Sequence, residues 1–295
     1  MPGARRLGGR APRIIAALIA GLAAGLVAYA WVRASLCPVE ALMSRAPRRT
    51  ALMRQRAAEA ERAGLPYRID QRWVSYEGVS PLLRRAILIA EDDAFYTHGG
   101  LDWNEIRAAA GTNLKKRRLV RGGSTITQQL ARNLFLGDSK SPQRKLTEVF
   151  VTLRLERALS KRRIFELYLN LIEWGDGIFG AEAASRRYFD VPASRLDERQ
   201  AILLAAVIIN PRRYSPLHPP RRIEQRVRII AARLLKRGFL TEDQYLTAVG
   251  RPPRPPGFFD WLFGAPREST TTVPAPTAPE STGVESTSVV DSLAG

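Results

Sequence analysis

The sequence predicts a mostly α-helical protein held on one N-terminal transmembrane helix. Residues 14–32 are uncharged and consist mainly of Ala, Leu, Ile, Gly and Val. From about residue 73 to 250, apolar residues recur at helical spacing, and convincing alternating strand patterns are scarce. The chain has 295 residues, which is enough for one large or two small domains.

The apolar stretch 14–32 is long enough to cross a bilayer. At about 1.5 Å per residue it approaches the ~30 Å thickness of the hydrocarbon core. Four arginines precede it, so the positive-inside rule places the N-terminus in the cytoplasm and the remainder outside. A cleaved signal peptide is the alternative interpretation. We favour an uncleaved anchor because the stretch is long for a signal peptide. Trp31 near its end and Arg33 just after it are typical of the interface between membrane and water.

Composition divides the chain into five regions. The expected order is a basic cytoplasmic N-terminus (1–13), the transmembrane anchor (14–32), a juxtamembrane helical region (33–72), the main helical domain (73–250) and a Pro/Thr/Ser-rich tail (251–295). The tail is rich in Thr, Ser and Pro and carries little charge. This composition cannot bury enough surface to fold alone, so we expect disorder there.

Helix signals are strong inside the main domain. A stripe at i, i+3, i+4 and i+7 should face the core, and it consists of Ile164, Leu167, Tyr168 and Leu171. The segment from Ser194 to Asp197 resembles a capping box before an apolar run, and Asn210-Pro211 should end that helix. Thr241 should start the next one.

Charge and residue counts exclude several classes of protein. There are 46 Lys and Arg against 28 Asp and Glu, a net charge of +18, most of it in residues 14–250. An anionic partner is therefore favoured: lipid headgroups, phosphates or nucleic acid. The predicted topology argues against nucleic acid. One cysteine excludes an intrachain disulfide, and no phosphate loop, dinucleotide fingerprint, zinc spacing or nucleophile elbow is present.

A polar run follows the glycine pair at 122–123. Hydroxyls, carboxamides and cations alternate along one short predicted helix, where a hydrophobic core requires none of them. Such a run suits a ligand that carries sugar hydroxyls and negative charge. The residues are Ser124, Thr125, Gln128, Gln129, Arg132 and Asn133.

Glu91 stands where an apolar run meets a Gly-rich loop. The run 86–90 reads as the end of a helix, so partial burial would raise the pKa of this carboxyl, as a general base or acid requires. A surface acid near a helix end is the alternative, and the spacing by itself does not choose between them.

Arg144, Lys145 and Glu148 form a second chemical block. Arg144 and Glu148 are four residues apart, and the simple interpretation is a surface ion pair worth about 0.2–0.5 kcal/mol. Both should point away from an apolar stripe of Leu146, Val149, Phe150 and Leu153. The functional interpretation places these groups in a cleft with Arg132 and Lys140, where four cations neutralise a diphosphate leaving group.

Together these segments resemble the peptidoglycan glycosyltransferase family, which also supplies the glycosyltransferase domain of class A penicillin-binding proteins. Five blocks match in order, and the last is weaker because it keeps Arg226 but lacks a second adjacent arginine. They are Glu91-Asp-x-x-Phe-x-x-His-x-Gly100, Gly122-Gly-Ser-Thr-Ile-Thr-Gln-Gln129, Arg144-Lys-x-x-Glu148, Lys161-x-x-Ile-x-x-x-Tyr-Leu-Asn170 and Gln225-Arg-x-x-Ile-Ile230. No transpeptidase motif follows, so the chain resembles the monofunctional biosynthetic form.

The resemblance implies a lysozyme-like helical fold with a membrane-associated subdomain. It also implies polymerisation of lipid II by inverting β-1,4 glycosyl transfer, with release of undecaprenyl diphosphate. Glu91 is then the base, and Glu148 is the second catalytic carboxylate. The resemblance further implies that Asp92, Phe95 and His98 shape the loop and that the polar run together with Lys140, Arg144 and Lys145 binds the substrate and its diphosphate.

The same resemblance implies the surroundings of the enzyme. It allows for a divalent cation, Mg²⁺ or Mn²⁺, assisted by Glu148, and it implies no organic cofactor. The partners are lipid II, the nascent strand, the membrane and other cell-wall synthesis or division proteins, with no nucleic acid. The location is the bacterial inner membrane, with the catalytic domain outside the cytoplasm.

Two rival functions stay open at this point. A lytic transglycosylase would cleave the same glycan with a glutamic acid, but it needs no diphosphate site. A non-catalytic membrane-tethered scaffold, or a binder of polyanions, would also account for the basic body.

Overall fold

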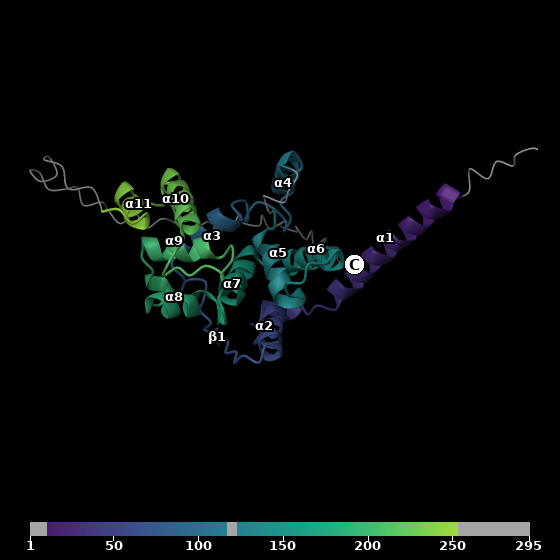
Figure 1. Ribbon diagram of the computed structural model, residues 1–295, viewed down its shortest axis with the longest axis horizontal. Coiled ribbons are helices and arrows are strands. Elements are labelled where there is room, and N and C mark those ends of the chain that lie inside the picture. Colours follow the sequence, from purple (N-terminus) through teal and green to yellow (C-terminus); the bar gives the residue numbers. More distant parts are fainter. Residues whose placement is uncertain (1–10, 117–122, 253–295) are drawn as a thin grey trace, which may run out of the picture.

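The computed structural model describes residues 11–116 and 123–252, and in these ranges it is dominated by helices (Figure 1). The expectations for the residues before 11 and for the tail after 252 lie outside the described residues. The predicted helical class is confirmed. In chain order the helices are α1 Ala11–Ser35, η1 Glu40–Met43, α2 Ala51–Arg62, α3 Pro81–Glu91, α4 Trp103–Lys116, α5 Ile126–Ala131, η2 Arg132–Leu136, α6 Pro142–Ala158, α7 Lys161–Leu171, α8 Ala181–Phe189, η3 Ala193–Arg195, α9 Glu198–Val207, α10 Arg221–Lys236 and α11 Glu242–Ala248.

α1 is the apolar helix that the composition predicts, and it is longer than the uncharged stretch. It projects from the helical body (Figure 1), and its segment Arg13–Ser35 is long and apolar enough to cross a membrane. Most of its side chains are exposed. Only its last turns join the body, where Ala30 and Ala34 are fully covered.

One small sheet accompanies the helices. β1 Asp70–Gln71 pairs in parallel with β3 Ile178–Phe179, which pairs antiparallel with β2 Glu173–Gly175. Gly177 turns the chain between β2 and β3 with φ of 73°, and a Cβ there would meet the Arg68 carbonyl oxygen. The sheet thereby ties the segment before α3 to the segment after α7.

α7 is the central helix of the core. The predicted stripe of Ile164, Leu167, Tyr168 and Leu171 is confirmed, since all four are fully buried. Phe165 and Leu169 are buried as well, so most of the helix surface is covered. α5 packs on α7 from one side, and α3 packs on α9 beside it. The core thereby holds the ends of α3 and α5 in fixed positions.

Two predictions about helices need correction. Asp197, not Ser194, caps α9, because the Asp197 carboxylate accepts from the Gln200 backbone N–H while Ser194 lies in η3. The helix ends at Val207, three residues before Asn210. Thr241 does cap α11 as predicted.

The buried face of α6 also differs from the prediction. Thr147, Glu148, Val151 and Leu155 are buried, whereas the predicted stripe of Leu146, Val149, Phe150 and Leu153 is only partly covered. The apolar spacing was read correctly, but α1 packs against α6. The predicted stripe packs partly against the core through Phe150, and the face with Glu148 is the more deeply buried one.

Asn170 joins the core to the loop that leads into α3. Its carboxamide nitrogen donates to the Val74 carbonyl at 2.9 Å and to the Glu166 carbonyl at 2.8 Å, and its oxygen accepts from the Val74 N–H at 2.8 Å. The side chain is fully buried. No water can replace these bonds without opening the core.

We expect Asn170→Ala to lower the free energy of unfolding by about 2–4 kcal/mol, because it leaves a backbone N–H and a carbonyl of Val74 without partners. Thermal and denaturant unfolding of the full chain in detergent, followed by circular dichroism, measures this. Asn104→Ala, an exposed helical asparagine, is the control. A variant as stable as the parent protein contradicts the assignment.

Candidate active site

Glu91 is the last residue of α3, as predicted, and it borders a cavity. Leu83, Ala86 and Ile87 of the same helix are fully buried, which anchors α3 in the core. Asp92 then leaves helical geometry with φ of −162°. The carboxylate is 13% exposed, and it lines a cavity of about 310 Å³. It is therefore largely covered but open to a ligand on one side.

Both oxygens of the Glu91 carboxylate accept hydrogen bonds. Arg226 Nη2 donates to Oε1 at 2.5 Å, and Gln129 Nε2 donates to Oε2 at 3.0 Å. Tyr168 Oη donates to Gln129 Oε1 at 3.0 Å. Because the phenol occupies the carbonyl end of the amide, the NH₂ end faces the carboxylate. The rotamer of Glu91 is thus held from α5, α7 and α10 together.

These surroundings shift the pKa of Glu91 upward from its ordinary value. Burial raises it, and Arg226, Gln129 and Arg132 oppose the rise by favouring the charged form. Burial is the larger effect because the site excludes most water from the carboxylate. A carboxylate with a raised pKa is a stronger base than an ordinary glutamate, and it is suited to removing a proton from a hydroxyl.

Two arginines of α10, and Arg237 directly after it, contact the end of α3 and the residues that follow it. Arg226 Nη2 also donates to the Ala90 carbonyl at 3.1 Å, and Arg233 donates to the Ile89 carbonyl at 3.3 Å. Arg237 makes two contacts with the Asp93 carboxylate. Cations at a helix C-terminus satisfy its free carbonyls and its negative dipole end. The sequence left the role of Arg226 uncertain; the i, i+7, i+11 spacing of these arginines was the available signal.

Asp92 and His98 connect the loop after α3 to the start of α5. His98 Nε2 lies 2.9 Å from Asp92 Oδ1, and the Ile126 N–H donates to Asp92 Oδ2 at 2.9 Å. The Gly100 N–H donates to His98 Nδ1 at 3.0 Å, so the ring carries its proton on Nε2. Thr125 Oγ1 donates to the Gly100 carbonyl at 2.6 Å. The geometry matches the loop-shaping role predicted for Asp92 and His98.

Phe95 and Gly100 complete this loop. Phe95 is fully buried against Phe165, and the Lys161 ammonium lies 4.5 Å from its ring centre. Gly100 has φ of 94°, and a Cβ there would lie 2.8 Å from side-chain carbons of Glu156 and Thr152. A larger residue at position 100 would push the loop away from α6.

The polar run of α5 divides into structural and cavity-facing groups. Thr125 caps the helix, and its N–H donates to Gln128 Oε1 at 3.1 Å in a capping box. Gln128 and Asn133 are buried, so Gln128 supports the cap instead of offering its amide to solvent. Ser124 is exposed and lines the same cavity as Glu91. Substrate binding by this run stays a prediction.

Arg144, Lys145 and Glu148 form a compact ion cluster at the start of α6. Arg144 Nη1 lies 2.6 Å from Glu148 Oε2, and Lys145 Nζ lies 2.5 Å from Oε1. Glu148 is 2% exposed, so its charge orients the two cations. Lys145 Nζ also contacts Ser124 Oγ at 3.3 Å. The cluster therefore stands beside the cavity that Glu91 borders.

The four cations predicted to surround one leaving group have different surroundings, and their joint action stays a prediction. Arg144 and Lys145 share Glu148, whereas Arg132 lines a second cavity of about 260 Å³ together with Gln129. Lys140 is exposed in the segment between η2 and α6. Arg132 is also close enough to Glu91 to lower the pKa of its carboxyl.

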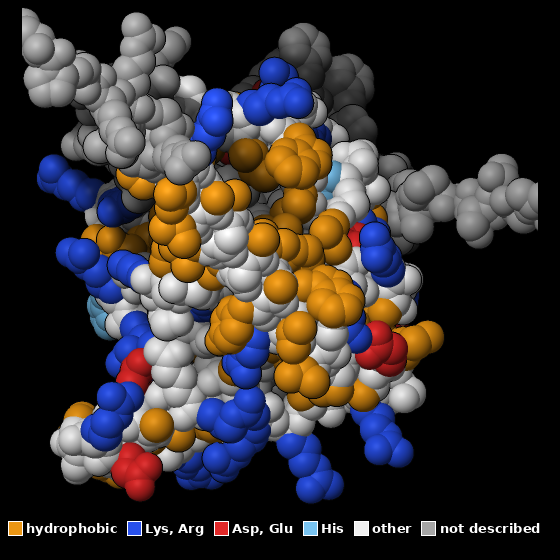
Figure 2. Space-filling view, turned by 90° about the vertical axis from the view of Figure 1, so that its right-hand side faces the viewer, with side chains coloured by type: hydrophobic (Ala, Val, Ile, Leu, Met, Phe, Trp, Pro, Cys, Tyr) orange, Lys and Arg blue, Asp and Glu red, His pale blue; other side chains and the backbone are white. Residues whose placement is uncertain are grey.

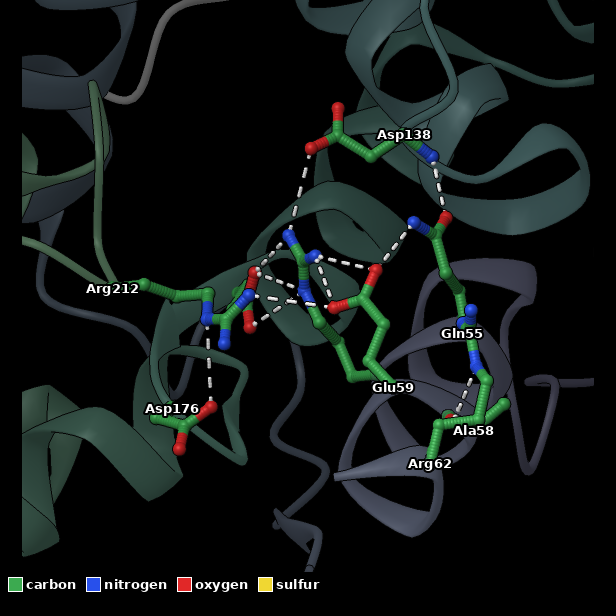
Figure 3. A network of polar contacts seen from close by, with 9 residues as sticks. Gln55, Ala58, Glu59, Arg62, Asp138, Asp176 and Arg212 are labelled. Atoms are coloured by element: carbon green, nitrogen blue, oxygen red, sulfur yellow. Dashed lines mark hydrogen bonds and ion pairs between the residues drawn. The ribbon is translucent and has the colours of Figure 1, made fainter.

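Charged side chains line the second cavity. Arg56 of α2 lies 3.1 Å from Glu173 Oε2 and 3.6 Å from Asp138 Oδ2. Burial raises the pKa of Glu173, and Arg56 opposes this rise. Figure 3 shows how Gln55, Glu59 and Arg212 extend the network, with Arg212 reaching both Glu59 and Asp176. The sequence analysis did not identify these residues, which lie far apart in the chain.

The predicted cation at Glu148 stays a prediction with little support from the geometry. Both carboxylate oxygens already contact Arg144 and Lys145. Within residues 11–116 and 123–252, no group of three or more His, Cys, Asp or Glu side chains could hold a metal ion. The residues around Glu148 therefore do not fit a metal site built by the protein.

The face from which α1 projects combines apolar and basic side chains. Figure 2 shows hydrophobic side chains gathered over the middle of this face, with Lys and Arg around its margins. Exposed apolar residues include Leu18 and Leu22 of α1 and Trp103 of α4. Such a surface suits contact with lipid headgroups and acyl chains.

Comparison with known proteins covers the region that contains this site. A family model described as Transglycosylase matches residues 58–235. The biosynthetic peptidoglycan transglycosylase of Laribacter hongkongensis (strain HLHK9) is 48% identical over 188 residues, covering 64% of this chain and 82% of that protein. Its counterpart in Chromobacterium violaceum is 44% identical over 223 residues, covering 75% and 96%.

Solved structures also match part of the chain. One of them is penicillin-binding protein 1A from Haemophilus influenzae, with 25% identity and a TM-score of 0.29 over 44% of this chain and 16% of that chain.

We expect Glu91→Gln to melt at a higher temperature than the parent protein at pH 8, by roughly 2–4 °C, the shift that ~1 kcal/mol produces in a domain of this size. A carboxylate with a raised pKa stabilises the fold only below its unfolded pKa, and this contribution is lost as pH rises through the folded pKa. The difference should disappear near pH 4.

Thermal unfolding in detergent at both pH values measures the effect. Glu61→Gln makes the same chemical change at an exposed position of α2, and it should leave the melting temperature unchanged. Equal melting temperatures of the Glu91→Gln and parent proteins at pH 8 would contradict a raised pKa of the Glu91 carboxyl.

Proposed function

The chain belongs to the transglycosylase family, as a peptidoglycan transglycosylase of cell-wall biosynthesis, and from this premise we propose that it polymerises lipid II into glycan strands by inverting β-1,4 glycosyl transfer with release of undecaprenyl diphosphate. The observation that carries this proposal is the placement of Glu91, a buried base, in one cavity with Ser124, which contacts the Lys145 ammonium.

In the proposed reaction Glu91 removes the proton from the 4-hydroxyl of the acceptor N-acetylglucosamine. The resulting oxygen attacks the anomeric carbon of the donor from the face opposite the diphosphate. The new C–O bond forms as the bond to the diphosphate oxygen breaks, so the configuration inverts. The raised pKa of Glu91 supports this role, because proton removal becomes favourable as the carboxylate is desolvated.

The leaving diphosphate accumulates negative charge as the bond breaks. Lys145 and Arg144 are held by Glu148 before the substrate arrives, so little reorganisation is needed during the reaction. An arginine can bind phosphate oxygens through two N–H groups, and a lysine acts as a point charge. This arrangement supports synthesis over hydrolytic or lytic cleavage, which has no diphosphate to stabilise.

Two cavities on either side of the Glu91–Gln129 pair support a reaction between two saccharides. Glu91 lines one cavity, and Gln129 and Arg132 line the other. We propose that the donor diphosphate lies on the side of Lys145 and that the second cavity accommodates the other sugar chain. Ser124, Thr125, Gln129 and Asn133 are the proposed polar contacts, and Arg132 faces the second sugar chain.

The enzyme is proposed to work at the outer face of the bacterial inner membrane. α1 provides one segment of sufficient length and hydropathy, and the arginines before it favour a cytoplasmic N-terminus. Lipid II stays in the membrane, so an anchored domain with a basic and apolar face meets its substrate there.

We expect the purified full chain to convert labelled lipid II into polymer that is visible as a ladder on gels. Glu91→Gln should reduce the rate by about 10²–10⁴-fold, the usual range for loss of a general base. Glu148→Gln should also reduce it, because Lys145 and Arg144 lose the group that orients them. Lys236→Ala, an exposed cation of α10, serves as control. Full polymer formation by Glu91→Gln would reject the assignment, and release of anhydro-sugars from mature glycan would favour a lytic enzyme.

The pH dependence of kcat/KM provides a separate test. The midpoint of the acid limb of this pH profile should lie above the ordinary pKa of a glutamate, because burial raises the pKa of Glu91. Arg226 lowers that pKa, so Arg226→Ala should move the limb to still higher pH. Arg228→Ala, an exposed neighbour on α10, should leave it in place. A limb that stays fixed or moves to lower pH in Arg226→Ala contradicts the electrostatic argument.

A further inference from the structure

Arg154, on the side of α6 that meets the anchor helix, makes contacts that the reaction does not explain. Its Nη1 donates to the carbonyl oxygens of Ala34 at 2.5 Å, Ser35 at 3.0 Å and Cys37 at 3.0 Å. Its Nη2 lies 2.6 Å from Glu40 Oε1. One guanidinium therefore contacts four groups at the C-terminal end of α1.

These contacts are suited to the end of a helix. The last carbonyls of an α-helix have no partner within it and carry partial negative charge. Ala34 and Ser35 belong to the last turn of α1, and Cys37 lies two residues beyond its end. A guanidinium offers several N–H donors in one plane, so it can satisfy several of these carbonyls at once. Arg154 is 25% exposed, which limits competition from water.

Packing supports the same connection. Ala30 and Ala34 lie four residues apart, on one face of α1, and both are buried while most of the helix is exposed. α1 packs against α6, and small side chains let the two helices approach closely. Ala34 and the following Val39 and Leu42 belong to the hydrophobic core of the body. The anchor is therefore joined to the domain without a flexible linker.

α6 carries the Arg144–Lys145–Glu148 cluster as well as Arg154. Glu148 lies six residues before Arg154, which is about 9 Å along a helix. Arg144 and Lys145 stand one turn earlier, at the start of α6. The proposed diphosphate-binding groups and the grip on the anchor thus belong to one rigid helix of 17 residues.

We propose that Arg154 is a positioning residue that clamps α6 to the membrane anchor and thereby fixes the height of the Arg144–Lys145–Glu148 cluster above the bilayer. This inference rests on the proposed function, since a lipid-linked diphosphate is the group to be met. Such a substrate cannot leave the headgroup region, so the protein has to present its cations at that depth. Misplacement by about 1 Å can reduce a rate by 10²-fold.

The test uses the full chain reconstituted in liposomes and two substrates. One is long-chain lipid II embedded in the same bilayer, and the other is a short-chain, water-soluble lipid II analogue added from solution. We expect Arg154→Ala to polymerise the embedded substrate about 10-fold more slowly than the parent protein and the soluble analogue within about twofold of it. Arg154→Lys, which keeps a cation near the carbonyls, should recover part of the lost rate.

Arg157→Ala is the matched control, because Arg157 is exposed one turn further along α6. It should behave as the parent protein with both substrates. Equal losses of Arg154→Ala on both substrates would mean a general structural role and would overturn the proposal, as would no loss on either. Absence of polymer from the parent protein itself would instead reject the proposed function.

A second measurement reports the clamp directly. Spin labels at Leu22 of α1 and Arg157 of α6, both exposed, are introduced into the full chain with Cys37→Ala. The parent background should give a narrow distance distribution in liposomes, and Arg154→Ala should broaden it. Equal widths in the two backgrounds would overturn the clamp, whatever the activity shows.

Discussion

The structure depends above all on holding one largely buried carboxylate in a fixed position. Glu91 loses most of its water, and the free energy of that desolvation is only partly offset by Arg226 and Gln129. Each of these partners comes from a different helix, and Tyr168 fixes the amide of Gln129 from a third. The end of α3 therefore meets side chains from within α5, α7 and α10 at one point.

Paired charges recur at each junction between helices. Glu148 holds two cations at the start of α6, Arg237 holds Asp93 beside Glu91, and Arg56 holds Glu173 beneath the second cavity. The chain has a net charge of +18, so basic side chains are in excess and are available for such pairs. Breaking the pairs of Glu148 or Glu173 leaves a buried charge uncompensated, so these two junctions resist displacement. The result is a site whose cations are arranged before a ligand arrives.

The membrane anchor belongs to this arrangement. α1 ends against α6, with Ala30 and Ala34 buried and Arg154 bound to the carbonyls of the last turn. The same α6 presents Arg144 and Lys145 beside the cavity of Glu91. In the proposed reaction, substrate binding and catalysis are therefore linked through one helix. The face in Figure 2 carries apolar side chains over its middle and basic side chains around its margins.

The sequence by itself determined the class of fold, the anchor, the end of α3 at Glu91, the buried stripe of α7 and the family. These are local or periodic properties: apolar length, spacing of 3.6 residues, capping residues, and motifs that keep their order along the chain. The buried face of α6 was misassigned because periodicity locates an apolar stripe but does not say whether the core or another helix covers it.

Only the tertiary structure decided which charges act together. The pairing of Glu91 with Arg226 spans 135 positions, and Arg56 meets Glu173 across 117. Neither pair leaves a signature in spacing. Arg132, which the sequence groups with Arg144 and Lys145, lines the second cavity, and the joint action of the three stays a prediction. Electrostatic partnership depends on distances through space, and the packing of helices sets those distances.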